Sequence, residues 1–541
     1  MKFFDSIPAA AIITLGAIFS IVLTGCNDAP TNESLHHSSL IYCSEGSPDS
    51  FNPQLVSGSG TTLDALSNTL YNVLLSSDPD TQSFVPELAT SWQVSEDGLT
   101  YIFNLRKNVA FHNTEYFTPT RLFNADDVLF SFNRTLDPNH PYHDINGGNY
   151  NKQVSDSTVD ITALSPYQVQ FKLSQPDSTF LYNLAADYSV ILSQEYGAAL
   201  TQQNNPSQID NLPIGTGPFM FREYKRDELI RYYRHNRYWK NNNNFQQLVF
   251  DITKHGPARM AKLMTHECDI SAYPPPHQLP LLDARPDIKV DKAISLNVGF
   301  WAFNTTKPPF DQVLVRKALA HAINLDAIIS AVFYGYATKA DSLLPPTSWG
   351  YHRNEQPIQY DPKKARQLLR QAGYGQGFSM NIWATPIRRD YMPNAYKVAE
   401  LMQSDLDKVG IKVEIVTFDW TTFRKRMRNG EHDSVVIGWS ADHADPDSFF
   451  SSTLSCNAKS TGTNRALWCN TKFDNLLTSA LTTRQTAARK AIYRKAQSII
   501  NQQVPLFPLG HSQKFQAYLN NVHGLKVQPY GAISFENARK K

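Results

Sequence analysis

The sequence has few charged residues for its length and almost no excess of either sign. Of 541 residues, 18% are charged, and 51 Lys and Arg oppose 49 Asp and Glu, which gives a formal net charge of +2. A protein whose main ligand is nucleic acid carries a basic excess that neutralises phosphates. The near-balance of charges argues against nucleic acid as a partner.

The length of the sequence predicts about three or four folded units.

Motifs of the common enzyme classes are also missing. The sequence has no Gly-x-x-x-x-Gly-Lys-Ser/Thr loop for phosphates, and Gly510-His511-Ser512 lacks the second glycine of a nucleophile elbow. His266-Glu267 is not followed by the second histidine of a zinc protease, and neither an EF-hand loop nor a CxxC pair occurs. We therefore expect a protein that is not an enzyme and needs no metal or cofactor, and we keep an exported peptidase as an alternative.

Long hydrophobic runs are scarce, and the longest lies at the N-terminus, at Ala9–Leu23. It is shorter than the roughly 20 residues of a membrane-spanning helix and is typical of a signal peptide, which we place at residues 1–25. Leu23-Thr24-Gly25-Cys26 then resembles a bacterial lipobox, so we expect Cys26 to be lipidated and residues 26–39 to form a polar tether. The alternative is an ordinary cleaved signal peptide in which Cys26 is incidental.

The sequence has only five cysteines. With Cys26 lipidated, an even number remains, which predicts two disulfides in an exported protein. Cys456 and Cys469 lie close in sequence and would close a short loop, which leaves Cys43 to pair with Cys268. That second pair would hold together two segments far apart in the chain, and it predicts a domain built from separated segments.

The remaining pattern predicts a mixed α/β protein without internal repeats. Apolar residues alternate around Asp97-Gly98, which is typical of a β-hairpin, and Asp361-Pro362 begins an apolar stripe of helical period that ends at Gly373. Ala395–Val409 has the pattern of a helix and is followed by the β-rich segment Ile411–Val416. Helix followed by strand in this region predicts βαβ units in the C-terminal half.

Two segments are candidate junctions between domains. The polar, proline-containing run Gln202–Pro213 is typical of a surface connection. The more apolar run Ala293–Asn304 is predicted to be one strand that passes between two lobes.

Three carboxylates follow directly after an apolar segment that is predicted to be a buried strand. Asp442, Asp445 and Asp447 come after Val435–Trp439, and ligands of open α/β sheets collect at such strand ends. We expect Asp447 to cap a helix that begins near Ser448. Asp442 is then left to pair with an ammonium group of a ligand.

A basic pair follows another predicted strand. Arg388 and Arg389 come after the β-like segment Ser379–Trp383, and the arginine fork suits a carboxylate. Trp420 and Trp439 offer apolar faces nearby in sequence, and the alternative for both is ordinary core packing. An Asp and an Arg on opposite sides of a cleft would bind the two ends of a zwitterion such as a short peptide. The alternative for the basic pair is that both arginines are exposed and solvated, as surface arginines usually are.

Several long motifs occur in a fixed order, from about Leu40 to about Phe535. They are Pro86-Glu87-Leu88-Ala89 with Trp92, Leu105-Arg106 with Phe111-His112, Asn124 through Arg134, Ile214 through Phe219, and Val315 through Asn324. In this order they resemble the family 5 extracellular solute-binding proteins of peptide and nickel ABC importers. Within that family the chain is similar to the dipeptide-binding proteins and, through Phe117–Arg121 and Asp445–Phe450, to the Sap-type proteins linked to antimicrobial-peptide sensitivity, which we favour.

The resemblance implies an α/β, two-lobed periplasmic-binding-protein fold of type II, in the peptide- and nickel-binding class, with an extra inserted domain. On this chain we expect a discontinuous domain I at residues 40–85, 210–296 and 505–541, the inserted domain II at residues 86–209, and domain III at residues 297–504. Both predicted disulfides have counterparts in the family.

The resemblance also implies roles for single residues. In dipeptide-binding relatives an Asp after the Gly-Trp strand pairs with the α-ammonium of the peptide, and an Arg before Pro-Asn-Ala binds its carboxylate. These positions match Asp442 and Arg389. The sequence departs from the family pattern on both sides of Arg389, at Arg388 and Asp390. Arg388 could be the anchor in place of Arg389, and Asp390 could neutralise the arginine that binds the carboxylate. The aromatic lining of the family maps onto Trp420, Trp439 and Tyr391.

The function that the resemblance implies is the capture of a peptide outside the cytoplasm. We expect ligands from dipeptides to oligopeptides, including cationic antimicrobial peptides, and delivery to an ABC permease in the inner membrane of a Gram-negative bacterium. The protein would work in the periplasm, held to a membrane by the lipid on Cys26. A haem or other non-peptide solute carrier of the same fold is the alternative.

Overall fold

The computed structural model describes residues 38–55, 61–78, 81, 83–147, 154, 157–240 and 245–541. The expected signal peptide, Cys26 and the expected tether up to residue 37 lie outside these residues. Among the residues that are described, no helix is both long enough and apolar enough to cross a bilayer.

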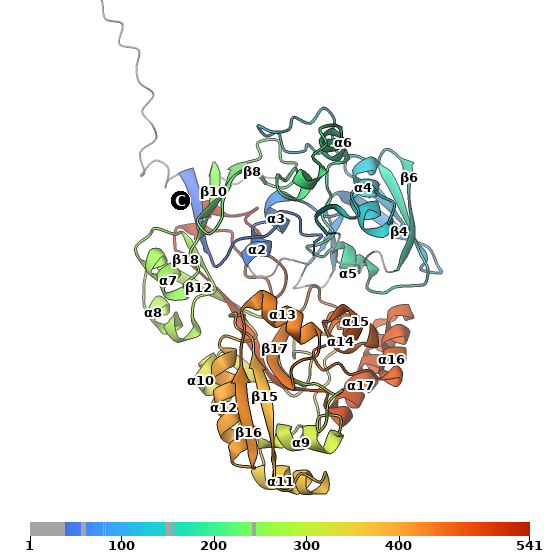
Figure 1. Ribbon diagram of the computed structural model, residues 1–541. Helices are drawn as coiled ribbons and strands as arrows, with labels where there is room; N and C mark the ends of the chain where they lie inside the picture. The colour runs from blue at the N-terminus through green and yellow to red at the C-terminus, as the bar shows by residue number, and fades with distance from the viewer. Residues whose placement is uncertain are drawn as a thin grey trace, which may run out of the picture.

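The described chain forms two lobes, and one large sheet runs through both (Figure 1). We call residues 38–294 and 513–541 the upper lobe and residues 297–512 the lower lobe. The sheet runs in the order β16 (Ile411–Val416), β15 (Phe378–Ala384), β17 (Ser434–Ser440), β13 (Asn297–Phe303), β18 (Leu506–Leu519), β11 (Ile270–Ala272), β1 (Ser39–Ser44), β10 (Gln247–Ile252), β9 (Leu229–Arg234) and β8 (Phe219–Lys225).

The long strand β18 joins the lobes. Its residues Leu506–Gly510 pair with β13, and its residues Gln513–Leu519 pair with β12 (Ile288–Ile294). The segment 505–541 is expected to lie wholly in domain I, whereas the first half of this strand pairs with β13 of the lower lobe.

The run 293–304, expected to be one strand, is broken into β12 and β13. At the break, the main-chain N–H of Leu296 donates to the carbonyl of Pro529 at 2.9 Å, and Ser295 Oγ donates to the same carbonyl at 3.0 Å. These hydrogen bonds go to a distant segment and not to a sheet neighbour, so the chain changes direction between the lobes. The prediction of a single strand is wrong at this point.

The upper lobe carries a smaller sheet in the segment expected to be inserted. Its order is β4 (Ala89–Val94), β5 (Thr100–Leu105), β7 (Gln168–Leu173) and β6 (Thr158–Ser165). The turn from β4 to β5 holds Gly98 at a φ of +73°, which favours glycine, and it confirms the expected hairpin. The helices of this part are α4 (Ala125–Leu136), which packs on β6 and β7, α5 (Phe180–Leu184) and α6 (Gln194–Gln202).

The lower lobe contains the expected βαβ arrangement. Strands β15 and β16 are parallel and are joined by α12 (Ala395–Asp407), and β15 is also parallel to β17. Asp361 caps α11 (Pro362–Gln371), because its carboxylate accepts the N–H of Lys364 at 2.9 Å. The other helices of this lobe are α9 (Val313–Ala322), α10 (Leu325–Phe333), α13 (Trp420–Arg428), α14 (Asp447–Leu454), α15 (Cys456–Thr461), α16 (Thr471–Thr482) and α17 (Thr486–Gln503).

Strand β13 is buried on both faces, which explains its unbroken apolar sequence. Trp301 and Phe303 point into one hydrophobic cluster of the lower lobe, and Phe300 and Ala302 point into another. Short elements complete the described chain: α2 (Thr61–Asp64), α3 (Ser67–Leu70), β2 (Leu75–Ser77), β3 (Phe84–Pro86), η1 (Ile145–Gly147), η2 (Pro206–Asp210), α7 (Gly256–Met264), η3 (Pro276–Gln278), α8 (Leu279–Asp283), β14 (Ala337–Lys339), β19 (Val522–His523) and β20 (Arg539–Lys540).

The run 202–213, expected to be a surface connection, contributes a buried anchor. Asp210 in η2 forms an ion pair with Arg134 of α4, with 2.6 Å between Oδ2 and Nη2, and both side chains are almost completely buried. A buried carboxylate needs such a partner, because an unpaired one is strongly destabilising. Most of the run is exposed or half-buried, as expected of a surface connection, and Asp210 is a buried anchor within it.

The structure contains disulfides between Cys43 and Cys268 and between Cys456 and Cys469, the pairs expected from the sequence. The first links β1 to the residue two positions before β11, and these two strands are neighbours in the upper lobe. It therefore joins two segments that are far apart in the chain within one sheet.

Candidate functional site

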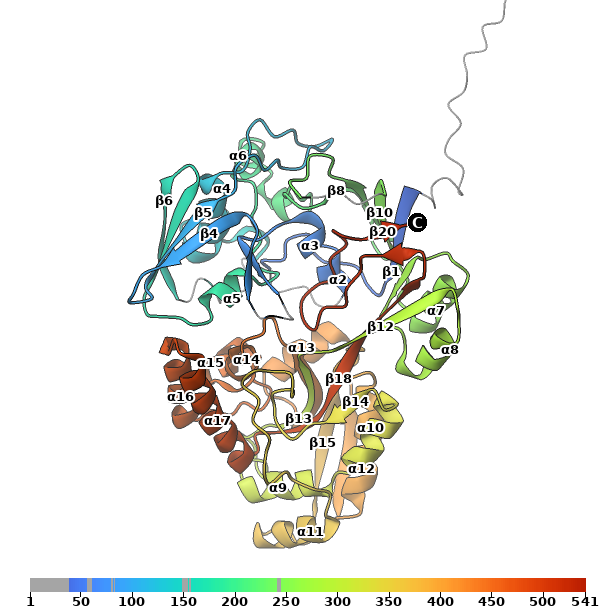
Figure 2. The ribbon, with the colours of Figure 1, turned by 180° about the vertical axis from the view of Figure 1, so that it is seen from behind.

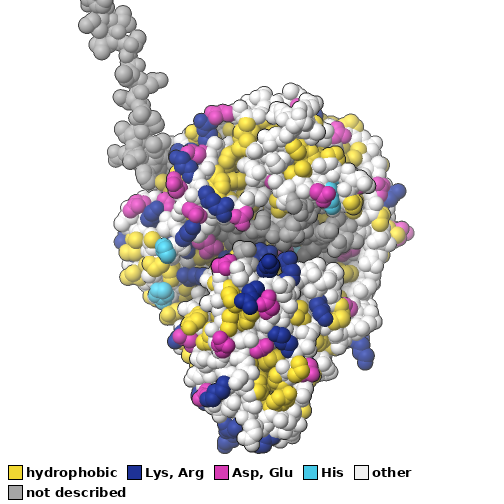
Figure 3. Space-filling model, in the orientation of Figure 1, with side chains coloured by type: hydrophobic (Ala, Val, Ile, Leu, Met, Phe, Trp, Pro, Cys, Tyr) yellow, Lys and Arg dark blue, Asp and Glu magenta, His cyan; other side chains and the backbone are white. Residues whose placement is uncertain are grey.

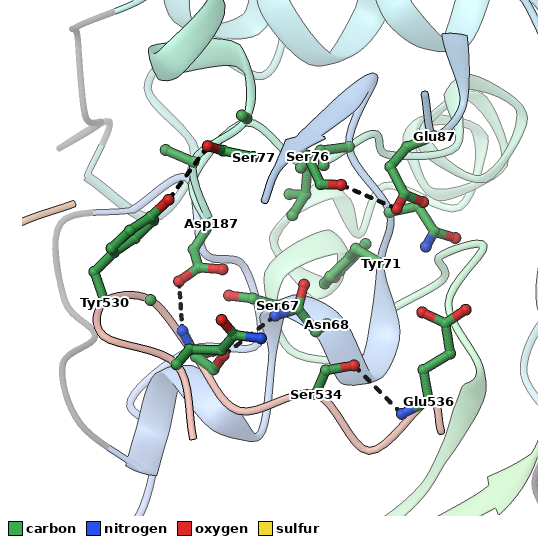
Figure 4. A pocket seen from close by; sticks show the side chains of 18 of the residues that line it. Ser67, Asn68, Tyr71, Ser76, Ser77, Glu87, Asp187, Tyr530, Ser534 and Glu536 are labelled. Atoms are coloured by element: carbon green, nitrogen blue, oxygen red, sulfur yellow. Dashed lines mark hydrogen bonds between the residues drawn. The ribbon is translucent and has the colours of Figure 1, made fainter. Parts of the chain in front are cut away.

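A cavity of about 220 Å³ lies where the two lobes meet (Figure 4). Most of its wall comes from the upper lobe: α3, the segment around Asp187, and the C-terminal residues 528–536. Figure 4 shows Asp187 and Tyr530 on one side of the cavity and Glu87 and Glu536 on the other. The lower lobe contributes Asp442, from the loop that follows β17. Groups of both lobes therefore face one partly open cavity.

The carboxylate of Asp442 is only partly exposed and has no cation beside it among the described residues. Its own N–H donates to Ser448 Oγ at 2.9 Å, which fixes the loop. Burial, and to a lesser degree the nearby Asp187, raises the pKa of Asp442 to about 7. A carboxylate with a raised pKa and no positive partner suits an ammonium group brought by a ligand.

The rest of the cavity is also acidic. Asp187 accepts the N–H of Ala532 at 2.9 Å, and burial raises its pKa to about 6. Lys240 bridges Glu87 and Glu536, at 2.7 and 3.3 Å. Ser67 Oγ is buried at the wall without a hydrogen-bond partner in the described part of the chain. A cation with hydrogen-bonding capacity is the ligand group that this lining favours.

Arg389 lines a different and much smaller cavity, of about 20 Å³, together with Arg388, Asp390 and Ser512. Main-chain hydrogen bonds in both directions between Arg389 and Met392, at 3.2 and 3.0 Å, close the tight loop that carries it. Its Nη1 lies 3.5 Å from Oε1 of Glu45 in the upper lobe. The structure therefore does not place Arg389 and Asp442 in one cavity.

The two residues do lie at the same edge of the lower sheet. They follow β15 and β17, which are parallel neighbours, so both loops leave the carboxyl ends of their strands. Ser512 Oγ links the two regions: it donates to the carbonyl of Asp390 at 2.8 Å and accepts from Asn297 Nδ2 at 2.9 Å, and Asn297 lies opposite Ser440 in β17. This edge faces the upper lobe.

The acid at ion-pair distance from Arg389 is Glu45 and not the adjacent Asp390. Sequence reasoning missed Glu45 because 344 residues separate the two in the chain. The available signal is its position directly after β1, a strand end like those of Asp442 and Arg389. Burial raises the pKa of Glu45, and Arg389, Arg259 and Arg388 oppose that rise.

The three expected aromatic lining residues surround the same edge without lining either cavity. The ring of Tyr391 packs directly against Gly438, where any side chain would overlap it. Trp420 is stacked on Phe423 with ring centroids 6.0 Å apart. Trp439 is partly buried, and its Nε1 has no hydrogen-bond partner among the described residues. Their role as a ligand lining remains a prediction.

The loop after Asp442 is held by a buried ion pair. Arg489 of α17 binds Asp445 with 2.6 Å between Nη1 and Oδ2, and Asp445 also accepts the N–H of Asp447 at 3.0 Å. Helix α14 begins at Asp447, with Pro446 before it and no side-chain cap. The prediction that Asp447 caps this helix is wrong, because Asp445 accepts the first free N–H.

The lobes also touch on the side of the inserted sheet. The N–H and Oγ of Ser178 donate to the carbonyls of Leu481 and Thr483, at 2.8 and 2.7 Å. Arg484 Nη1 donates to the carbonyl of Glu96 at 2.7 Å. These hydrogen bonds form only while the two lobes are in contact.

Comparisons with known proteins identify relatives along nearly the whole chain. A family model described as "Bacterial extracellular solute-binding proteins, family 5 Middle" matches residues 83–461. The chain is 42% identical over 508 residues to the dipeptide-binding protein of Escherichia coli (strain K12), which covers 93% of this chain and 95% of that protein. It is 38% identical over 530 residues to the probable ABC transporter periplasmic-binding protein SapA of the same organism, which covers 97% and 96%.

A solved structure shows the same fold. The dipeptide-binding protein from Pseudoalteromonas sp. SM9913, crystallised in complex with Met-Leu, has a TM-score of 0.89 and is 49% identical. The match covers 93% of this chain and all of that chain. The two-lobed fold expected from the sequence is confirmed.

Proposed function

This chain belongs to the family 5 bacterial extracellular solute-binding proteins, and from that premise we propose that it is the solute-binding component of a peptide ABC importer. It captures a peptide between its lobes outside the cytoplasm and delivers it to a membrane permease, without covalent chemistry. The relatives named as dipeptide-binding proteins, one of them bound to Met-Leu, support a dipeptide or another short peptide as the ligand.

The observation that carries this proposal is the position of the Asp442 carboxylate and its lack of a positively charged partner among the described residues. Its carboxylate faces a cavity between the lobes, and no cation of the described residues pairs with it. Desolvating an unpaired carboxylate is costly, so a ligand ammonium that pairs with it contributes strongly to binding. The α-ammonium of a peptide is such a group, and every peptide with a free N-terminus has it.

We assign the carboxylate end of a dipeptide to Arg389. The guanidinium lies at the same edge of the sheet as Asp442, and its present partner is the Glu45 carboxylate of the upper lobe. A peptide carboxylate takes the place of that internal one. Main-chain groups and termini then supply most of the binding energy, which makes recognition tolerant of side chains.

The location follows from the N-terminal sequence. We propose that residues 1–25 direct export, that Cys26 carries a lipid, and that the mature protein stays attached to a membrane in the periplasm of a Gram-negative bacterium. A lipid anchor adds the membrane surface to the partners and keeps the protein near the permease.

Thermal unfolding with three related ligands tests the proposal. Ala-Ala should raise the melting temperature, because a ligand that binds only the folded state stabilises it. N-acetyl-Ala-Ala should raise it far less, since acetylation removes the ammonium that faces Asp442. Ala-Ala amide should also be weaker, since it lacks the carboxylate for Arg389.

Two outcomes contradict the proposal. An equal shift with the acetylated peptide means that Asp442 does not bind the ammonium. Recovery of free alanine from the incubated dipeptide, measured by mass spectrometry, means that the chain is a peptidase.

A further inference from the structure

The larger cavity between the lobes carries an excess of negative charge. Among the described residues, its wall contains the carboxylates of Asp187, Asp442, Glu87 and Glu536 and the ammonium of Lys240. The whole chain is close to neutral, with a formal net charge of +2. On the face shown in Figure 3, charged side chains of both signs are intermixed. The acidity is therefore a property of this cavity and not of the molecule as a whole.

Two of these carboxylates lack a positive partner. Lys240 bridges Glu87 and Glu536, which leaves one negative charge on the three side chains together. In the described part of the chain, no cationic side chain is at ion-pair distance from Asp187 or Asp442. A ligand with a single ammonium group at Asp442 therefore leaves Asp187 unpaired, and an unpaired carboxylate that is partly removed from water is costly.

Asp187 is held at the cavity wall by the C-terminal segment. Its Oδ2 accepts the N–H of Ala532 at 2.9 Å, and no described residue donates to Oδ1. Lys514 opposes the rise in the pKa of Asp187 that burial causes, but its Nζ donates to the carbonyl of Gly531 at 3.0 Å and not to the carboxylate. Figure 2 shows the C-terminal segment as a red loop near α2 and α3, above the lower lobe. One oxygen of Asp187 is left for a ligand.

A second group of the same wall is also unsatisfied. Ser67 of α3 is 2% exposed, and its Oγ has no hydrogen-bond partner among the described residues. Figure 4 shows Ser67 and Asp187 among the side chains that line the cavity. Buried hydroxyl groups are normally paired, so an unpaired one at a cavity wall indicates a partner that a ligand brings. This observation does not depend on charge.

The position of Asp442 decides which part of a peptide enters the cavity. Asp442 is the residue of the lower lobe in this wall, and Arg389 lines the separate, smaller cavity. A peptide whose ammonium binds Asp442 and whose carboxylate binds Arg389 therefore runs away from the larger cavity. The first side chain leaves the same carbon atom as the ammonium, so it is the group of the peptide that lies next to the cavity.

The rest of the wall suits a long side chain with a charged end. Lysine and arginine bury their methylene stems along apolar surface while the charged group meets polar partners. The volume of about 220 Å³ is larger than the roughly 150 Å³ of a cavity that holds benzene. Apolar side chains also line the cavity: Val73, Ala185, Ala186, Val190 and Ala532.

We propose that this cavity is a subsite for a basic side chain of the first residue of the peptide, with Asp187 and Ser67 as its acceptors. This inference rests on the proposed function and names peptides that begin with lysine or arginine as the preferred ligands. Such a peptide brings two positive groups, one for each unpaired carboxylate. A peptide with a neutral first residue satisfies only Asp442.

The test compares dipeptides that differ in one charge and its position. Calorimetry at pH 8, where Asp187 and Asp442 are both ionised, is run with Lys-Ala, norleucine-Ala, Ala-Lys and Ala-norleucine. Norleucine keeps the methylene stem of lysine without its charge. Asp187→Asn removes the charge but keeps an oxygen for the N–H of Ala532. Asp144→Asn, at an exposed acid of the upper lobe, is the matched control.

The wild type should bind Lys-Ala at least about tenfold more tightly than norleucine-Ala, and Ala-Lys within about threefold of Ala-norleucine. In Asp187→Asn the first ratio should fall below about threefold, and in Asp144→Asn it should stay as in the wild type. Circular dichroism checks that each variant is folded. Should Asp187→Asn fail to fold, Ser67→Ala takes its place and should lower the ratio about two- to tenfold, as expected for one hydrogen bond.

Three results overturn the subsite. They are a wild-type ratio near one, a ratio that the variant leaves unchanged because all four dipeptides weaken equally or not at all, and a preference for lysine that is as large at the second position.

Failure of the proposed function gives a different result, because the wild type then binds none of the four dipeptides. In that case thermal shift with the diamine cadaverine decides on the subsite alone, since this molecule has two ammonium groups and no peptide groups. Stabilisation of the wild type that Asp187→Asn loses supports the subsite, and equal behaviour of the two proteins overturns it.

Discussion

Glu45 and Arg389 form an ion pair between the two lobes, with 3.5 Å between Oε1 and Nη1. Their side chains are 18% and 19% exposed, so the pair is largely removed from water. An arginine proposed to bind the carboxylate of a ligand is therefore already facing a carboxylate of the protein itself. The internal acid competes with the ligand for one guanidinium group.

Replacing Glu45 tests this competition. Glu45→Gln removes the charge but keeps the size, so dipeptides should bind several-fold more tightly. Arg389→Ala should weaken dipeptides by at least about tenfold, or roughly 1.4 kcal/mol. Calorimetry with Ala-Ala measures both effects.

Arg388→Ala is the matched control for Arg389→Ala and should have little effect on dipeptide affinity. A larger loss of affinity in Arg388→Ala than in Arg389→Ala would show that Arg388 is the residue that binds the carboxylate.

The stability of the free protein should depend on Asp442 in a defined pH range. Its pKa in the folded protein is about 7 and its ordinary value is 3.8, so the folded state binds the proton more tightly between these values. The free energy of unfolding therefore falls as the pH rises from about 4 to 7. Asp442→Asn should remove this loss: the variant should melt like the wild type near pH 4 and at a higher temperature at pH 7 to 8.

The same variant should bind dipeptides much more weakly at pH 8, because a neutral amide does not pair with the ammonium. In the stability experiment Asp187 also titrates in this pH range, with a pKa of about 6. The quantity to follow is therefore the difference in melting temperature between Asp442→Asn and the wild type at each pH. Glu228→Gln, at an exposed side chain of the upper lobe, serves as the control. A constant difference in melting temperature across the pH range contradicts the assignment.

Much of this site could be read from the sequence, because strand ends and long motifs are local signals. Asp442 and Arg389 were found as charged residues after apolar strands, and the structure places both at one sheet edge. Glu45 could not be paired with Arg389 in the same way, because only the fold brings β1 opposite that edge. Asp442 and Arg389 also line separate cavities, which no spacing along the chain reveals.

The errors about the fold have a common cause. Sequence pattern reports the polarity of a segment and not the partner that its polar groups find. Asp210 lies in a polar run but is buried against Arg134, and Asp445 and not Asp447 accepts the first N–H of α14. No glycine or proline marks the break between β12 and β13 in the sequence. At this break Ser295 Oγ and the N–H of Leu296 donate to the carbonyl of Pro529, far along the chain, and sequence pattern does not reveal that partner.

The ion pair between Arg489 and Asp445 should be essential for the loop that carries Asp442. Both side chains are buried, at 6% and 0% exposure, so Arg489→Met leaves a buried carboxylate without its partner. We expect a loss of about 3–5 kcal/mol in the free energy of unfolding, measured with denaturant, and weaker dipeptide binding.

Two further variants make this prediction specific. Arg494→Met changes an exposed arginine of the same helix and should cost little. The double variant Asp445→Leu/Arg489→Met should recover part of the lost stability, because apolar side chains can replace a buried ion pair. Equal effects of Arg489→Met and Arg494→Met would show that the pair does not hold the loop.

The contact between the lobes at Ser178 should contribute to affinity for every ligand alike. Its Oγ donates to the carbonyl of Thr483 at 2.7 Å, and this hydrogen bond exists only while the lobes touch. Ser178→Ala removes this hydrogen bond and lowers the population of the form in which the lobes touch. Each peptide should therefore bind about two- to tenfold more weakly, as expected for one hydrogen bond. The melting temperature without ligand should change little.

Thr483→Ala is the matched control for this prediction, because the acceptor is the main-chain carbonyl, which the substitution keeps. Calorimetry with Ala-Ala and with Ala-Ala-Ala separates closure from recognition: a variant that affects closure weakens both peptides by the same factor. A loss confined to one peptide, or an equal loss in Thr483→Ala, contradicts the role of this hydrogen bond. Because Ser178 is remote from Asp442 in the chain and contacts α16 and the turn after it, uniform weakening shows that ligand affinity includes the free energy of bringing the lobes together.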